Sequence, residues 1–117
     1  MPSLDDVRRI ALSLPEASEA PHFHLTSFRV ATKIFATFGP DRPLMLKLDP
    51  VDQANLAADD PERIVPVPGV WGRQGSTFVR IETLSEAQLS RLVRMAWARS
   101  APKRLLKAHP GLIGGGV

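Results

Sequence analysis

Two histidines lie two residues apart in the stretch PHFHLTSFRVATKIF. In an extended chain, His22 and His24 would project to the same side, which is acceptable geometry for two imidazole ligands of a metal ion. Zinc usually takes three or four protein ligands, and the one other histidine is the distant His109. No spacing requires Glu19 or Asp41 to complete a set. We therefore predict no metal and no cofactor here, and strand or loop histidines that lead into a hairpin.

Other catalytic constellations are also missing from the sequence. No serine lies in a Gly-x-Ser-x-Gly elbow or another recognisable nucleophile setting. The carboxylates form no obvious buried pair, and most fall at predicted caps and loops, where solvent keeps them ionised. These residues predict a protein that is not an enzyme.

The segment PGVWGRQGST is rich in glycine. A phosphate-binding loop normally leads from a strand into a helix, whereas this segment leads into another predicted strand. We therefore expect a turn or hairpin loop. Trp71 and Arg73 within it could stack on a base or ring, although a core or lid role for Trp71 is the plainer alternative. A small-ligand pocket near Trp71 and His22 is a weaker possibility, because no convergent polar groups are visible.

Length and composition indicate one domain over residues 1–110 and a flexible tail over residues 111–117. A chain of 117 residues with 44% hydrophobic and 23% charged residues is typical of a soluble globular protein. No apolar run approaches the roughly 20 residues that span a bilayer. No secretory signal is visible at the start, and there is no cysteine, so we expect a cytoplasmic location.

The charge is uneven along the chain. From Ala87 onward there are six Lys or Arg and no Asp or Glu, while the rest has nine basic and twelve acidic residues. Such a basic block suggests a polyanionic partner. A solvated helix end is the alternative, because cations near a helix C-terminus are favoured by the macrodipole.

Capping signals and periodicity predict the helices. Ser3 and Asp6 form a capping box for a first helix that Pro15 closes, and Ser85 with Gln88 does the same for a long last helix that Pro102 ends or kinks. Asp49 and Pro50 predict a short middle helix. Residues 103–107 could add one further turn.

Alternating patterns predict five strands, which are Ser27–Ala31, Lys33–Phe38, Leu44–Leu48, an irregular edge strand at Ile64–Pro68, and Thr77–Glu82. The order α-β-β-β-α-β-β-α then predicts a two-layer α+β domain with a mostly antiparallel sheet. Because each helix has one apolar stripe, we expect the helices on one face of the sheet and an open face on the other.

Alternation along the strands assigns seven side chains to that open face. They are Arg29, Lys33, Phe35, Met45, Lys47, Phe78 and Arg80. Cations beside aromatic rings can hold a phosphate backbone and offer surfaces for stacking. The same mixture also suits an interface with a second subunit, because large apolar groups on an exposed face call for a cover.

Five blocks resemble, in order and spacing, the motifs of the MmcQ/YjbR family. They are Leu12–Glu16, HFHLTSFRVATKIFATF, PLMLKLDP, Val70–Gly75 and AWARSAPKRL. The resemblance implies an α-β(3)-α-β(2)-α fold, similar to type III secretion chaperones, and a DNA-binding label that rests partly on likeness to a double-wing domain. One departure is Gly75-Ser76-Thr77, where the family motif has Gly-Trp-Thr.

Charge, fold and resemblance together lead to a non-enzymatic module that binds nucleic acid, with DNA as the first candidate. The expected contacts are Arg29, Lys33, Lys47, Trp71, Arg73, Arg80, Lys103 and Arg104. The alternative is a dimeric, chaperone-like protein-binding module that uses the same sheet face. A monomer and a homodimer are both open, and no membrane partner is expected.

Overall fold

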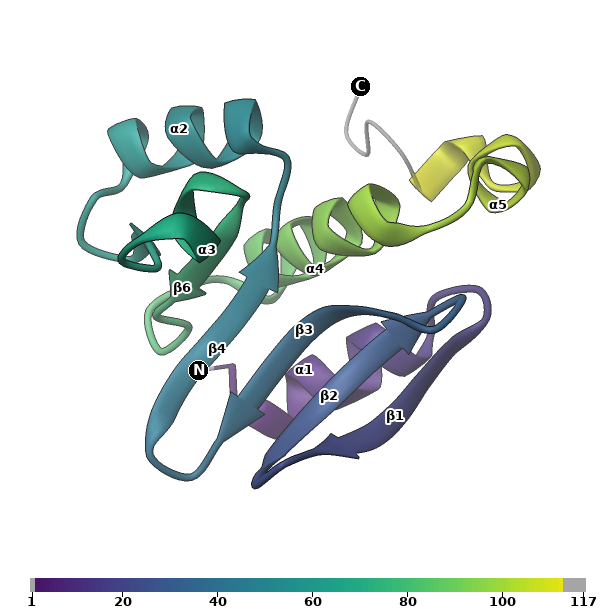
Figure 1. Cartoon of the computed structure of the whole chain (residues 1–117), viewed down its shortest axis with the longest axis horizontal. Helices are drawn as coiled ribbons and strands as arrows, with labels where there is room; N and C mark the ends of the chain where they lie inside the picture. The colour runs from purple at the N-terminus through teal and green to yellow at the C-terminus, as the bar shows by residue number, and fades with distance from the viewer. Residues whose placement is uncertain (1, 113–117) are drawn as a thin grey trace.

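The computed structural model describes residues 2–112 and contains one sheet covered by helices. The six strands pair antiparallel throughout, in the order β1-β2-β3-β4-β6-β5. In Figure 1, α1 and α4 lie behind the strands, so the opposite face of the sheet is turned toward the viewer. Of the expected tail, residues 113–117 lie outside the described part, and Gly111 and Leu112 belong to the short 3-10 turn η1 (Pro110–Leu112).

The elements have the following bounds. The strands are β1 (Ala17–His22), β2 (Leu25–Val30), β3 (Lys33–Gly39), β4 (Arg42–Lys47), β5 (Ile64–Pro66) and β6 (Ser76–Val79). The helices are α1 (Leu4–Leu12), α2 (Pro50–Asp59), α3 (Val70–Arg73), α4 (Glu86–Ser100) and α5 (Lys103–Ala108). The predicted two-layer α+β fold is thus confirmed, with one more strand than expected and two short helices beyond the predicted order. Of these two, α5 corresponds to the possible further turn at residues 103–107, and α3 was not expected. None of the described helices is long and apolar enough to cross a membrane.

The predicted helix starts are confirmed at atomic detail. The Ser3 amide donates to the Asp6 carboxylate at 2.8 Å, and the Asp6 amide donates back to the Ser3 hydroxyl. Ser85 and Gln88 repeat this capping box at α4, with both bonds between 2.8 and 3.0 Å. These reciprocal bonds satisfy amide groups that the first helical turn leaves without partners, which is why such local signals are readable in the sequence.

Two elements were not predicted. Strand β1 has the sequence ASEAPH, which lacks an alternating run of large apolar residues, and it is held by its pairing with β2. Helix α3 is a single turn inside the segment that was expected to be a hairpin loop. Both edge strands contain a proline, Pro21 in β1 and Pro66 in β5.

A β-bulge in β3 changes which side chains face the helices. Phe28 pairs with Ala36 and Arg29 pairs with Ile34, so Phe35 is an extra residue without a partner in β2. The Phe35 ring is fully buried in the core, and Lys33 lies in register with the buried Val30. The prediction that Phe35 and Lys33 occupy the open face is therefore wrong, because the bulge reverses the alternation at this end of the strand.

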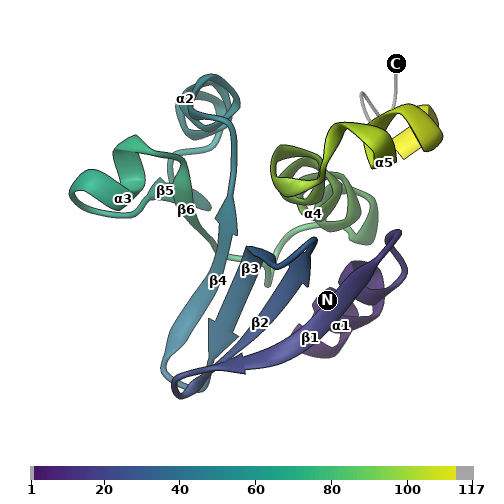
Figure 2. The ribbon, with the colours of Figure 1, turned by 45° about the vertical axis from the view of Figure 1, so that its right-hand side comes forward.

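The core lies between the sheet and the two longest helices. Helix α4 packs against β3 and β4 and also contacts α1. Its stripe ends at Trp97, which is fully buried and donates its indole N–H to the Pro15 carbonyl oxygen at 3.0 Å. Helix α2 is fixed at the other end of the sheet by Gln53, whose amide donates to the Ser76 carbonyl and the Thr77 hydroxyl. Figure 2 shows α2 and α4 at separate positions along the sheet.

Candidate nucleic-acid interface

The sheet face opposite α1 and α4, here called the outer face, is defined by the strand register. One cross-strand row on this face is formed by Ser27, Thr37, Met45, Phe78 and Val65. Met45 and Phe78 are half-buried, as expected for large side chains that lie flat on an uncovered sheet. Their placement on this face is confirmed.

Cations flank this row, whose apolar part is formed by Met45, Phe78 and Val65. Three cations belong to the same face, because each pairs across the strands with a residue of that face. Arg29 pairs with Ile34, Arg42 with Gly39 and Lys47 with Ser76. Within the described strands, no Asp or Glu points outward on this face, and the one acidic strand residue, Glu19, pairs with the core residue Phe28. No carboxylate of these strands therefore offsets the charge of the three cations on the outer face.

Arg29 is held in place by neutral groups. Its Nε donates to the Ser27 hydroxyl at 3.1 Å, and one terminal nitrogen donates to the Pro21 carbonyl at 3.4 Å. The Ser27 hydroxyl in turn donates to the Ala20 carbonyl at 2.7 Å. These bonds orient the guanidinium without neutralising it, so its charge stays available to an anion.

Arg42 is a candidate contact that the sequence analysis missed. Its guanidinium lies over the Phe78 ring, 5.5 Å from the ring centre, which places a cation beside the apolar row. The predicted third strand began at Leu44, whereas β4 begins at Arg42. The available signal was that Arg42 directly follows the Gly39-Pro40-Asp41 turn.

The remaining predicted contacts are spread around this face. Arg80 directly follows β6 and is exposed, and its amide bonds to the Arg63 carbonyl at 2.9 Å. Trp71 and Arg73 are exposed on α3, close in sequence to Ser76, which pairs with Lys47. Lys33 is exposed at the start of β3, and its pairing with Val30 assigns it to the face that the helices cover.

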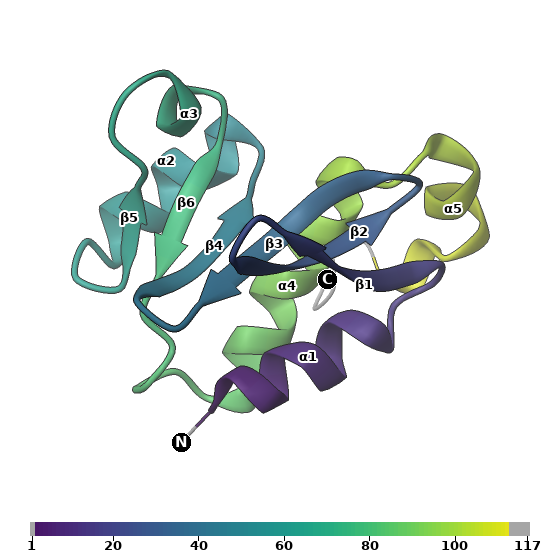
Figure 3. The ribbon, with the colours of Figure 1, turned by 60° about the horizontal axis from the view of Figure 1, so that its bottom comes forward.

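Lys103 and Arg104 do not join the other predicted contacts. Their helix, α5, lies at the opposite end of the molecule from α3 in all three views (Figures 1, 2 and 3). Arg104 also holds Glu16 through two bonds of 2.6 and 2.8 Å. This hydrogen bonding lowers the pKa of Glu16 and raises that of Arg104. Lys103 and Arg104 therefore lie apart from the cations of the outer face.

His22 and His24 do not lie on one extended strand. His22 ends β1, and Phe23 and His24 make the two-residue turn into β2, so the stretch is not extended as the two-ligand geometry required. Among residues 2–112, no group of three or more His, Asp or Glu side chains is placed to hold a metal ion. The His22 and Phe23 rings meet edge to face, with 4.8 Å between their centres.

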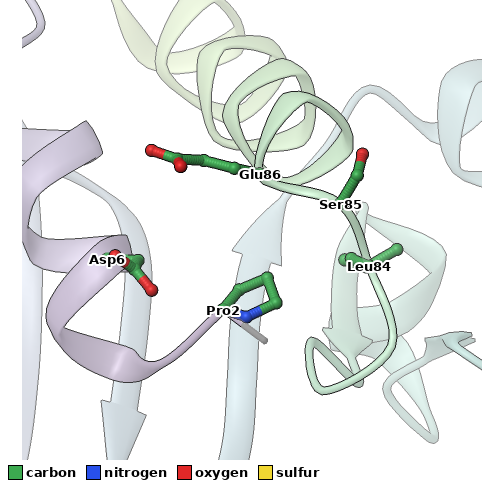
Figure 4. A pocket seen from close by; sticks show the side chains of 5 residues that line it. All are labelled: Pro2, Asp6, Leu84, Ser85 and Glu86. Atoms are coloured by element: carbon green, nitrogen blue, oxygen red, sulfur yellow. The ribbon is translucent and has the colours of Figure 1, made fainter.

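A pocket of about 200 Å³ lies between the starts of α1 and α4 (Figure 4). It is lined by Pro2, Asp6, Leu84, Ser85 and Glu86. Both carboxylates that line the pocket already have partners. Asp6 caps α1, and both Asp6 and Glu86 form ion pairs with Arg9. The Ser3 amide and Arg9 lower the pKa of Asp6, so the carboxylate stays ionised and structural.

A single antiparallel sheet, with α1 and α4 on one face and Arg29, Arg42 and Lys47 on the other, makes this an α+β protein. Comparison with family models places the chain in the YjbR family, whose model matches residues 12–99. The crystal structure of Deinococcus radiodurans protein DR2400, which carries family-model domain DUF419, superposes with a TM-score of 0.75. It is 23% identical and covers 100% of this chain and 96% of its own, a likeness that shows the fold. The curated proteins contain no match to this sequence.

Proposed function

We propose that this chain is a cytoplasmic, non-enzymatic module that binds nucleic acid, with DNA as the first candidate, on its outer face. The observation that carries the proposal is the cluster of Arg29, Arg42 and Lys47 on strands that point no carboxylate outward, with exposed Arg80 at the edge. Phosphates supply the matching negative charge, and half-buried stems keep the cationic heads in place.

The pairing pattern of the molecule supports this choice of cations. Among the described residues, ion pairs engage Arg8, Arg9, Arg63 and Arg104, and none of them engages Arg29, Arg42, Lys47 or Arg80. Within residues 2–112, no carboxylate oxygen lies within 4.0 Å of a side-chain nitrogen of Arg29, Arg42, Lys47 or Arg80. Binding an anion there therefore breaks no existing ion pair.

A salt titration tests the proposal. Labelled duplex and single-stranded oligonucleotides are titrated with the protein at about 50 and about 200 mM salt. About four phosphate contacts on duplex DNA predict a loss of affinity of about 150-fold between these two concentrations. No binding of either oligonucleotide at the lower concentration contradicts the proposal.

Matched substitutions locate the surface. Lys47→Ala and Arg80→Ala should each weaken binding and reduce the slope of log K against log salt by about 0.9. Arg91→Ala is the control, since Arg91 is an equally exposed cation on α4, away from the outer face. Equal losses for Arg80→Ala and Arg91→Ala would contradict the assignment to this face.

A second candidate function is a dimeric protein-binding module, favoured by the apolar row of Met45, Phe78 and Val65. Val65 is 38% exposed, so this row reaches the edge of the sheet. Two copies meeting through this face would bring like charges together, which disfavours self-association. Sedimentation at low protein concentration separates the two functions, because a persistent monomer removes the dimer.

A further inference from the structure

The aromatic side chains divide sharply by exposure. Phe28, Phe35, Phe38 and Trp97 are buried in the core, and Phe78 is half-buried under Arg42. The other two aromatic residues face solvent, since Phe23 is 89% exposed and Trp71 is 62% exposed. Both rings are therefore available for contact with a partner.

The backbone of Phe23 is strained. It occupies the turn between β1 and β2 with a φ of +57°, a left-handed conformation in which Asn or Gly is preferred. Its one aromatic neighbour is the His22 ring, and it joins none of the packed core. A strained backbone that displays an apolar ring points to contact with a partner.

Trp71 is displayed by a firmly anchored turn. The next residue, Gly72, packs so tightly on the Val67 backbone that an added Cβ would lie 1.7 Å from the Val67 carbonyl oxygen. This contact fixes α3 against the chain after β5 while Trp71 and Arg73 stay exposed. An indole beside a guanidinium is well suited to stacking on a planar ring.

The two rings are carried by segments on either side of β3 and β4. Phe23 lies where β2 begins, whereas α3 leads into β6, and β2 and β6 are separated by β3 and β4 (Figure 1). Of the outer-face cations, Arg42 and Lys47 lie on β4, between the two rings, and Arg29 lies further along β2. Positive charge therefore lies between the two candidate stacking surfaces.

We propose that the ligand of the outer face is a single strand of nucleic acid, with unpaired bases stacked on Trp71 and Phe23. This inference rests on the proposed function and narrows it. In a duplex the base faces are already covered by neighbouring pairs, whereas a single strand offers them to aromatic side chains. Each such stack contributes about 5- to 150-fold in affinity.

Intrinsic fluorescence can report the contact directly. The chain has two tryptophans, and Trp97 is fully buried with its indole N–H bonded to Pro15. Quenching by bases therefore reports on Trp71, and Trp71→Phe should abolish the signal while keeping a ring. The probes are dT12, rU12, a 12-base-pair duplex, and a 12-residue abasic strand that carries phosphates without bases, all at one salt concentration.

We expect dT12 or rU12 to quench Trp71 and to bind at least about 10-fold more tightly than the abasic strand and the duplex. The ratio of dT12 to rU12 affinity then tells whether the strand is DNA or RNA. Trp71→Leu and Phe23→Asn should each weaken single-strand binding by about 5- to 150-fold and leave binding of the abasic strand unchanged. Asn suits the left-handed turn, so Phe23→Asn should fold at least as well as the parent.

The outcomes separate this inference from the function on which it rests. If the duplex binds as tightly as dT12 and rU12 and Trp71→Leu changes nothing, the single-strand inference is overturned and phosphate binding stands. If none of the four probes binds, both are overturned. Binding of both single strands without quenching of Trp71 also overturns the stacking inference.

Discussion

The guanidinium of Arg42 lies 5.5 Å from the centre of the Phe78 ring, on the face of the sheet that the helices leave uncovered. Arg42 begins β4 and Phe78 lies in β6, so the contact spans two neighbouring strands. It gives the cation a fixed position and covers part of an apolar ring. One residue thereby contributes both to the stability of the sheet and to the charge of the candidate interface.

Arg42→Gln should therefore have two measurable effects. The free energy of unfolding should fall by about 0.5–1 kcal/mol, because the cation–π contact is lost. The salt slope of oligonucleotide binding should fall by about 0.9, because one phosphate contact is lost. Urea unfolding and the salt titration measure these effects, with the exposed α4 residue Arg99 changed to Gln as the control. Identical behaviour of the two variants would contradict both roles.

The pair of Glu16 and Arg104 predicts a specific pH dependence. Arg104 lowers the pKa of Glu16 in the folded protein, so the unfolded chain binds a proton at Glu16 more readily. The pair should therefore stabilise the fold above the ordinary glutamate pKa of about 4.3 and lose its effect as the pH falls through the lower folded value. The urea midpoints of the parent and Arg104→Gln, measured from neutral to acidic pH, should differ at neutral pH and converge in acid. A constant difference at every pH would contradict this account.

Two glycines with positive φ predict unequal costs of substitution. At Gly75, where φ is +110°, an added Cβ would lie 1.9 Å from the Leu48 carbonyl oxygen. At Gly69, where φ is +84°, it would meet nothing within 4 Å. Gly69→Ala should cost about 1–3 kcal/mol from backbone strain alone, and Gly75→Ala more than about 4 kcal/mol. Urea unfolding and the soluble yield measure the difference, and equal effects would contradict the role of the close approach.

The turn between β2 and β3 offers a stabilising change. Ala31 and Thr32 both have positive φ, at 49° and 69°, where Asn and Gly are the preferred pair. The double variant Ala31→Asn, Thr32→Gly should raise the free energy of unfolding by about 1–2 kcal/mol. Thr32→Gly alone should supply most of the gain, because Thr is β-branched. A lower melting temperature for the double variant would show that the turn needs its present residues.

Local signals account for the parts of the fold that the sequence predicted. The helix starts at Ser3, Asp49 and Ser85 follow from side chains that cap amide groups within three residues, so no tertiary contact is needed to see them. Strand β1 escaped prediction because its small and polar residues form a strand by pairing with β2. The single turn α3 depends on the tight seat of Gly72 on Val67, which is a tertiary contact.

The candidate site was predicted only in part, for a related reason. Arg29, Met45, Lys47 and Phe78 keep the alternation of their strands, so their face could be deduced from spacing. The bulge at Phe35 inserts one residue, and every side chain from there to the start of β3 changes face. The separation of α5 from the outer face, and the pairing of Arg104 with Glu16, depend on how the last helices pack.

The prolines of the two outermost strands have a consequence for how copies of this protein can meet. Pro21 in β1 and Pro66 in β5 carry no N–H, and β5 is three residues long. Neither border of the sheet can seat an additional strand with a complete ladder of bonds. Each border would lose a backbone hydrogen bond to an added strand, which disfavours growth into fibrils from either side of the sheet.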